Sequence, residues 1–102
     1  MEKISIAEFM RTFKPNDKIF ISNTNGKRFN EPRTIFKIDT TSIISIKENG
    51  KKIWLRKPTS ESQIFKDNDG NLILKNYLFE DNNDLIISRE PIPIHLNTTY
   101  SL

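Results

Sequence analysis

Cysteine is absent from the 102-residue chain, and histidine occurs once, as His95. Without thiols the chain can form no disulfide, no thiolate nucleophile and no cysteine-based zinc site. A single imidazole also excludes most histidine-based acid–base chemistry. The sequence contains no glycine-rich phosphate loop and no nucleophile elbow. We therefore expect a protein that is not an enzyme, with no catalytic residues, no bound metal and no cofactor.

Long apolar runs are also missing. No segment approaches the length of a membrane span, and residues 1–13 lack the apolar region of a signal peptide. Hydrophobic residues make up 35% of the chain and charged residues 28%, and isoleucine and phenylalanine are plentiful, which favours a folded domain over disorder. We expect one soluble, cytoplasmic domain over residues 1–102 with no membrane contact.

Valine is absent and alanine occurs once, whereas the chain has sixteen isoleucines, eleven asparagines and eleven lysines. Isoleucine, asparagine and lysine have AT-rich codons, while valine and alanine codons begin with G. The bias indicates an AT-rich genome, such as that of a low-GC bacterium or of its phage or plasmid.

Positive charge is concentrated in the middle of the chain. Residues 11–57 contain twelve Lys or Arg residues and four acids, a net charge of +8. Residues 58–102 contain three Lys or Arg residues and seven acids, a net charge of −4. The middle is thus a candidate surface for phosphates, and the C-terminal third is a candidate for a basic partner.

The strongest local signal is a β-hairpin over residues 42–57. Asn49-Gly50 between two alternating runs is typical of a two-residue type I′ turn. The register of such a turn predicts a core face, which carries Ile44, Ile46, Ile53 and Leu55. It predicts a second face on which an aromatic ring lies among cations and polar residues: Ile43, Ser45, Lys47, Lys52, Trp54 and Arg56.

A short helix is predicted over residues 5–13. Ser5 and Glu8 have the spacing of a capping box, and apolar residues recur at helical spacing after them. Pro15 disfavours helix at the residue before it. So short a helix is marginal alone, and we expect its apolar face to pack on a sheet.

Further strands are predicted at residues 18–22, 33–39, 63–66, 71–79 and 85–89, with a polar loop at 23–32 and a Gly70 hairpin turn. From Lys14 to Phe65 this order resembles the pattern of KOW, Tudor-like and related SH3-like barrels. The resemblance implies a mainly β fold with a minor α part. It divides the chain into an N-terminal capping helix (1–14), an SH3-like small barrel (15–66) and a C-terminal β-hairpin extension with a last strand and tail (67–102). It favours binding over catalysis. Ribonuclease toxins also use small basic barrels, but their arginine-proline entry motif is absent here.

Two interpretations of Trp54 remain open. If its ring is exposed among Lys47, Lys52 and Arg56, it suits single-stranded nucleic acid, because bases stack on aromatic rings and cations neutralise phosphates. If it is buried, it packs beneath the N-terminal helix or another aromatic ring while the lysines extend outward.

A second set of candidate phosphate-binding residues lies in and beside the polar loop, since loops on a rigid scaffold often carry binding groups. These residues are Lys27, Arg28, Phe29 and Arg33. The alternative is an ordinary solvated surface.

Acidic residues in the loop before the last strand form a candidate protein-binding surface: Glu80, Asp81 and Asp84. The Asp67–Gly70 segment lacks the spacing of a calcium loop and is typical of a turn.

The sequence thus favours a non-enzymatic module that binds single-stranded nucleic acid or structured RNA through a basic face with an aromatic residue. The alternative is a phage- or plasmid-encoded protein that modulates or inhibits a host protein through charge complementarity. An unpaired edge strand leaves a homodimer possible.

Overall fold

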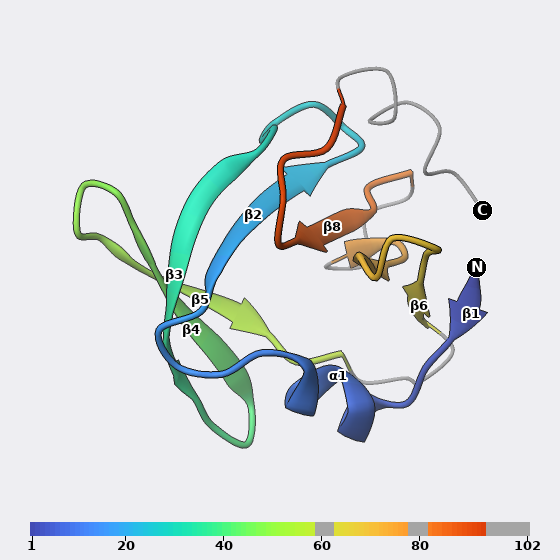
Figure 1. Cartoon of the computed structure of the whole chain (residues 1–102), viewed down its shortest axis with the longest axis horizontal. Coiled ribbons are helices and arrows are strands. Elements are labelled where there is room, and N and C mark those ends of the chain that lie inside the picture. Colours follow the sequence, from blue (N-terminus) through green and yellow to red (C-terminus); the bar gives the residue numbers. More distant parts are fainter. Residues whose placement is uncertain (59–62, 78–81, 94–102) are drawn as a thin grey trace.

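All described strands belong to one antiparallel sheet with the order β1-β6-β7-β8-β2-β3-β4-β5 (Figure 1). The computed structural model describes residues 1–58, 63–77 and 82–93. The elements are β1 (Glu2–Lys3), α1 (Ile6–Thr12), β2 (Lys18–Asn23), β3 (Glu31–Ile38), β4 (Ser42–Lys47), β5 (Lys52–Arg56), β6 (Ile64–Lys66), β7 (Leu72–Leu74) and β8 (Leu85–Ser88). Across these ranges, no helix has the length and apolar character that crossing a membrane requires.

The predicted mainly β fold is confirmed, but the sheet is not a closed barrel. β1 and β5 stand at the two ends of the strand order, so the sheet keeps two edges. β8 does not belong to an appended extension as expected. It pairs with both β7 and β2 and lies in the middle of the sheet. Its residues, from Leu85 to Ser88, are all buried, as expected for a strand covered on both faces.

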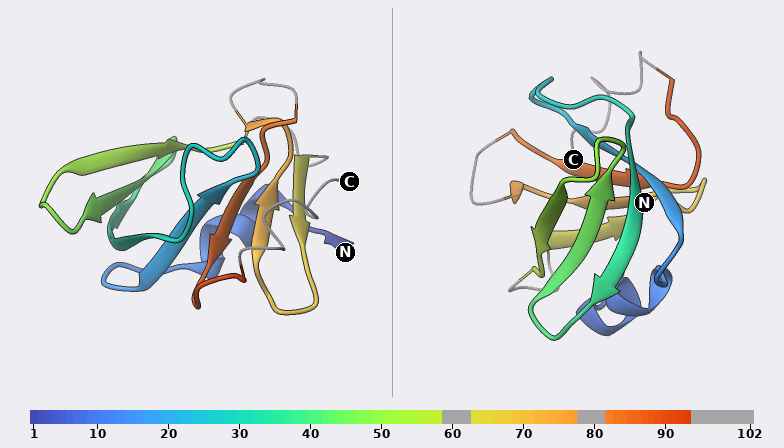
Figure 2. Two further views of the ribbon diagram at one scale, coloured as in Figure 1. Left: turned by 90° about the horizontal axis from the view of Figure 1, so that it is seen from above. Right: turned by 90° about the vertical axis from the view of Figure 1, so that its left-hand side faces the viewer.

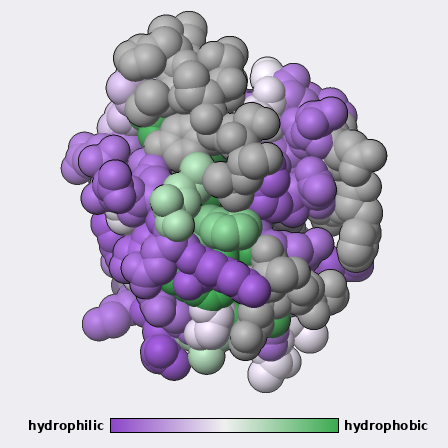
Figure 3. Space-filling model, turned by 90° about the vertical axis from the view of Figure 1, so that its right-hand side faces the viewer, coloured by the Kyte–Doolittle hydropathy of each residue, from purple (hydrophilic) through white to green (hydrophobic). Residues whose placement is uncertain are grey.

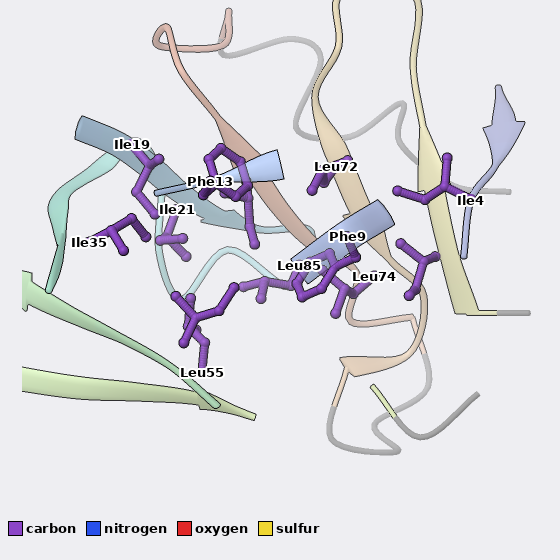
Figure 4. Packing of buried hydrophobic residues seen from close by; sticks show 13 residues of the cluster. Ile4, Phe9, Phe13, Ile19, Ile21, Ile35, Leu55, Leu72, Leu74 and Leu85 are labelled. Atoms are coloured by element: carbon purple, nitrogen blue, oxygen red, sulfur yellow. The ribbon is translucent and has the colours of Figure 1, made fainter. Parts of the chain in front are cut away.

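The main core lies on the inner side of the curved sheet, where α1 packs. Phe9 and Phe13 from the helix region lie among aliphatic side chains from strands on both sides (Figure 4). The buried members of this cluster are Ile4, Phe9, Phe13, Ile19, Ile21, Ile35, Ile43, Leu55, Ile64, Leu72, Leu74, Leu85 and Ile87. The helix therefore supplies the apolar cover that an open sheet of this size needs.

The helix begins as the sequence predicts. The Ser5 hydroxyl oxygen accepts a hydrogen bond from the Glu8 backbone N–H at 3.0 Å, which satisfies one of the free donors of the first turn. At the other end, the Arg89 guanidinium donates to the Thr12 carbonyl at 2.7 Å and lies 4.9 Å from the Phe13 ring centre. These contacts attach the end of the helix to the residue that follows β8.

The β4–β5 hairpin is confirmed, but its predicted register is wrong by one residue. The Gly50 N–H donates to the Lys47 carbonyl, and the Lys47 N–H donates to the Lys51 carbonyl, both at 2.9 Å. The loop therefore has three residues, and only Gly50, with φ of +87°, has a positive φ within it. This is a type I turn followed by a glycine bulge rather than a type I′ turn.

The shift reverses the faces predicted for the side chains of β4, whereas those of β5 keep their predicted faces. Ile43 lies opposite Leu55, and both are buried in the core. Ile44 lies opposite Trp54, on the outer face of the sheet. Because side chains alternate along a strand, Ile46 is also on the outer face instead of in the predicted core.

Replacement of Gly50 by alanine tests this loop. No atom lies within 4 Å of the position a Cβ would take, so the cost comes from the positive φ alone. We expect Gly50→Ala to lower the free energy of unfolding by about 1–2 kcal/mol, measured by denaturant titration. Gly50→Asn should cost less, because asparagine adopts this conformation more readily. Equal stability of wild type and Gly50→Ala would contradict the loop assignment.

Candidate nucleic-acid interface

The outer side of β3, β4 and β5 forms the most distinctive surface of the described residues. Figure 2 (right) shows these three strands side by side in front of the rest of the molecule. We call this surface the aromatic face. Strand pairing and alternation assign it Thr34, Phe36, Lys37, Ser42, Ile44, Ile46, Lys52, Trp54 and Arg56.

The aromatic face exposes two large rings. Trp54 is 58% exposed and Phe36 is 47% exposed. Ile44, which lies opposite Trp54 in the neighbouring strand, is only 8% exposed. The face therefore consists of two accessible rings beside a buried aliphatic side chain. Of the two interpretations of Trp54, the exposed one agrees with the structure.

Cations accompany these rings on the aromatic face, and one of them lies over a ring. The Lys52 ammonium lies 4.3 Å from the centre of the Phe36 ring, within the range of a cation–π interaction. Lys37 is exposed and lies opposite Ile44, next to the bulge that interrupts β3 after Ile35. No strand residue assigned to the aromatic face is acidic. Positive charge on this face is therefore not neutralised by its own strand residues.

Three predicted phosphate-binding residues lie elsewhere, around the Glu31 carboxylate. Arg33 Nε donates to Glu31 Oε2 at 2.7 Å, Lys47 Nζ lies 3.5 Å from Oε1, and Arg28 Nε lies 3.9 Å from Oε2. The Arg33 side chain is completely buried and also donates to the Ser45 hydroxyl at 3.3 Å. Arg33 is therefore buried rather than on the exposed surface that a phosphate-binding role would require. Lys47 does not share a face with Trp54 as expected, because it lies opposite Arg33 in the register.

The pKa of Glu31 reflects how these three cations favour the ionised form of its carboxyl group. Burial acts to raise the pKa of Glu31, since it removes water from the charged form. The hydrogen bond from Arg33 and the charges of Arg33, Lys47 and Arg28 act in the other direction and prevail. The pKa therefore lies below its ordinary value, and Glu31 remains ionised as the counter-ion of buried Arg33.

The loop between β2 and β3 presents the remaining candidates. Lys27 and Phe29 are exposed there, as a binding role would require. The loop is held in place by Asn30, whose side chain donates to the Ile92 carbonyl at 2.8 Å and accepts from its N–H at 2.9 Å. No described contact joins Phe29 or Lys27 to the aromatic face. The predicted set is thus divided among the aromatic face, the surroundings of Glu31 and this loop.

Of the three acidic candidates, the structure describes only Asp84. Asp84 is buried and accepts a hydrogen bond from Lys75 Nζ at 2.9 Å and from the Asn76 N–H at 3.2 Å. Asp84 is therefore part of the folded interior rather than of the exposed surface that a protein-binding role would require. Glu80, Asp81 and His95 lie outside the described residues.

Other surfaces of the described residues give fewer indications of a binding site. Within residues 1–58, 63–77 and 82–93, no three potential metal ligands come together. A hollow of about 690 Å³ borders the aromatic face at Ser42 and Arg56 and extends to Ile6 and Pro58. On the side that carries β1 and β6, an apolar area lies beside hydrophilic residues (Figure 3). The aromatic face remains the surface with the clearest chemistry.

Sequence reasoning identified Trp54, Lys52 and Arg56 but missed Phe36, Ile44 and Ile46 as their neighbours. The error has two local causes, the three-residue loop and the bulge in β3. A signal for the loop was present, because Glu48-Asn49-Gly50 fits a type I turn with glycine in the bulge position.

Comparison with known proteins finds no matching family model, no matching curated protein and no matching solved structure. The fold and the site must therefore be interpreted from their own chemistry. Together they define a mainly β domain with an exposed, basic aromatic face.

The Glu31 cluster generates a prediction about stability. Because the pKa of Glu31 is lower in the folded state than its ordinary value of 4.5, its contribution is present above that value and is lost as the pH falls through the folded-state pKa. We expect Glu31→Gln to lower the free energy of unfolding by about 3 kcal/mol at neutral pH, because Arg33 loses its counter-ion. The difference from wild type should shrink on acidification, as measured by urea titration across acidic and neutral pH.

The matched control is Arg28→Gln, which removes a long, partly exposed ion pair to the same carboxylate and should cost less than about 1 kcal/mol. A constant difference between wild type and Glu31→Gln at all pH values would contradict the proposed ionisation of Glu31.

Proposed function

We propose that this protein is a non-enzymatic module that binds single-stranded nucleic acid on its aromatic face. The observation that carries the proposal is the combination of two exposed rings, Trp54 and Phe36, with a lysine placed over one of them. Proteins that bind single strands without strong sequence preference combine aromatic platforms with a positive surface. The aromatic face has both properties and no strand acid that would repel phosphate.

The two rings lie on strands separated by one intervening strand. Strand spacing places β3 and β5 about 10 Å apart, so Trp54 and Phe36 stack on different bases. Lys37, Lys52 and Arg56 then neutralise the phosphates that accompany those bases. The proposed contacts are rings and charges rather than paired donors and acceptors, so sequence specificity is low and affinity decreases steeply with salt.

We also propose that this sheet is related to the SH3-like barrels. β2, β3, β4 and β5 follow one another both in sequence and in the sheet, as the first strands of SH3-like barrels do. We regard the present sheet as a relative of that arrangement that stays open because β8 occupies the position beside β2.

A protein partner is the second candidate function, in which a phage- or plasmid-encoded chain modulates a host protein. Trp54 and Phe36 favour it, because exposed aromatic residues beside aliphatic ones are typical centres of protein interfaces. A homodimer is a special case of this candidate.

Substitutions on the aromatic face test the first candidate. We expect Trp54→Ala to reduce affinity for a mixed-sequence, fluorescently labelled single strand by about 5- to 150-fold, the equivalent of 1–3 kcal/mol for one lost stacking contact. Trp54→Phe should retain most of the affinity, because it retains a ring. Fluorescence anisotropy titration gives both values. Equal affinities for wild type and Trp54→Ala would exclude Trp54 from the interface.

The salt dependence of binding distinguishes lysines that contact phosphates from lysines that do not. Lys52→Ala should weaken binding and lower the slope of log affinity against log salt by about one. Lys27→Ala, in the loop between β2 and β3, is the matched control and should leave the slope nearly unchanged, since Lys27 has no described contact with the aromatic face. If Lys27→Ala and Lys52→Ala change the slope equally, the phosphates are not localised on the aromatic face.

A further inference from the structure

The outer edge of β5 offers backbone hydrogen-bonding groups that no other described strand uses. β5 stands at the end of the strand order, so it pairs with β4 on one side only. The Lys51 carbonyl accepts from Lys47, and the Lys57 N–H donates to Thr41, both at 2.9 Å. Residues of odd number therefore direct their backbone groups toward β4, and Lys52, Trp54 and Arg56 direct theirs away from it.

One end of this edge is already capped. The Arg56 N–H donates to the Tyr77 hydroxyl at 3.3 Å. Burial, opposed by that hydrogen bond and by nearby arginines, raises the pKa of Tyr77, so the phenol is neutral and accepts the bond at physiological pH. Within the described residues, no hydrogen bond engages the outward N–H and carbonyl groups of Lys52 and Trp54. Figure 2 (left) shows this hairpin projecting from the rest of the molecule.

The side chains beside the open edge decide what can pair with it. If a second copy paired its β5 antiparallel about Trp54, Lys52 of each copy would face Arg56 of the other. Like charges directly opposite each other in a sheet are destabilising. Lysine on an edge strand is a common means of preventing such self-pairing. The same charges attract a strand that carries acids at the corresponding positions.

We propose that the open edge of β5 binds an extended acidic peptide segment of a partner protein by strand addition. The peptide places acidic residues opposite Lys52 and Arg56 and an apolar residue opposite Trp54. Main-chain hydrogen bonds to Lys52 and Trp54 supply the attachment, and the alternate side chains supply the preference, as in other strand-addition complexes. This inference goes beyond the proposed function, because it rests on the backbone edge rather than on the aromatic face.

A designed peptide tests the inference directly. The probe is acetyl-Thr-Glu-Thr-Val-Thr-Glu-Thr-amide, whose pattern is the same in parallel and antiparallel orientation. We expect binding that changes Trp54 fluorescence and slows amide hydrogen exchange at Lys52 and Trp54. A probe with both glutamates replaced by lysine should bind at least tenfold more weakly. The probe is also made in two N-methylated versions, each methylated at alternate residues. Each version blocks the N–H groups on one of the two pairing edges of the peptide. We expect one version to lose binding and the other to keep it.

A pair of protein variants isolates the backbone contribution. Lys52→Ala removes only the charge, whereas Lys52→Pro removes the charge and the outward N–H. Proline is tolerated on an edge strand when its missing N–H faces solvent, and circular dichroism verifies the fold. We expect Lys52→Pro to bind the probe about tenfold more weakly than Lys52→Ala, the equivalent of about 1.4 kcal/mol for one unsatisfied hydrogen bond.

Three results would overturn the proposal: no binding of the acidic probe, equal binding of the acidic and lysine probes, or equal loss of binding by both N-methylated versions. A dimer of the free chain by sedimentation, if Lys52→Pro dissociates it and Lys52→Ala does not, would instead assign the edge to a second copy. Binding of the oligonucleotide is measured on the same protein, so peptide binding without oligonucleotide binding refutes the proposed function alone. The reverse result refutes this inference alone.

Discussion

The three-residue loop between β4 and β5 determines which side chains of this hairpin are buried. Gly50 takes the positive φ that closes the loop, and the pairing that follows sets Ile43 against Leu55 in the core. The same pairing sets Trp54 against Ile44 on the outside. Side chains alternate between the two faces along a strand. A loop one residue shorter would therefore shift the pairing by one residue and place core residues of one strand on the same face as surface residues of the other. The aromatic face therefore depends on the geometry of this loop.

The basic middle of the chain is divided by the sheet into two environments with different chemistry. On the inner side, Arg33 is buried beside Ser45 and has the Glu31 carboxylate as its counter-ion. Such a charge contributes to the fold and is not available to a ligand. On the outer side, Lys52 lies over the Phe36 ring and Lys37 is exposed, with no acidic strand residue beside them. The net charge of the segment therefore indicates less about binding than does the location of the acidic residues that pair with its cations.

Local signals in the sequence predicted the local structure well. The Ser5 cap, the hairpin around Gly50 and the hairpin around Gly70 all form, because each depends on residues only a few positions apart. Pairings between distant segments were not predictable. β8 enters the sheet beside β2, more than sixty residues away, and the sheet is open instead of the expected closed barrel. Burial of Arg33 was missed, although Glu31 two positions earlier lies on the same side of the strand and could have indicated an ion pair.

The fluorescence of Trp54, the only tryptophan, tests the account most directly. Emission of the free protein should be that of a water-exposed indole, because the side chain is 58% exposed. Addition of a mixed-sequence single-stranded oligonucleotide should quench this emission, and the affinity should fall as salt is raised. An emission typical of a buried indole would contradict the exposed aromatic face. Exposed emission that no oligonucleotide changes would contradict its proposed function.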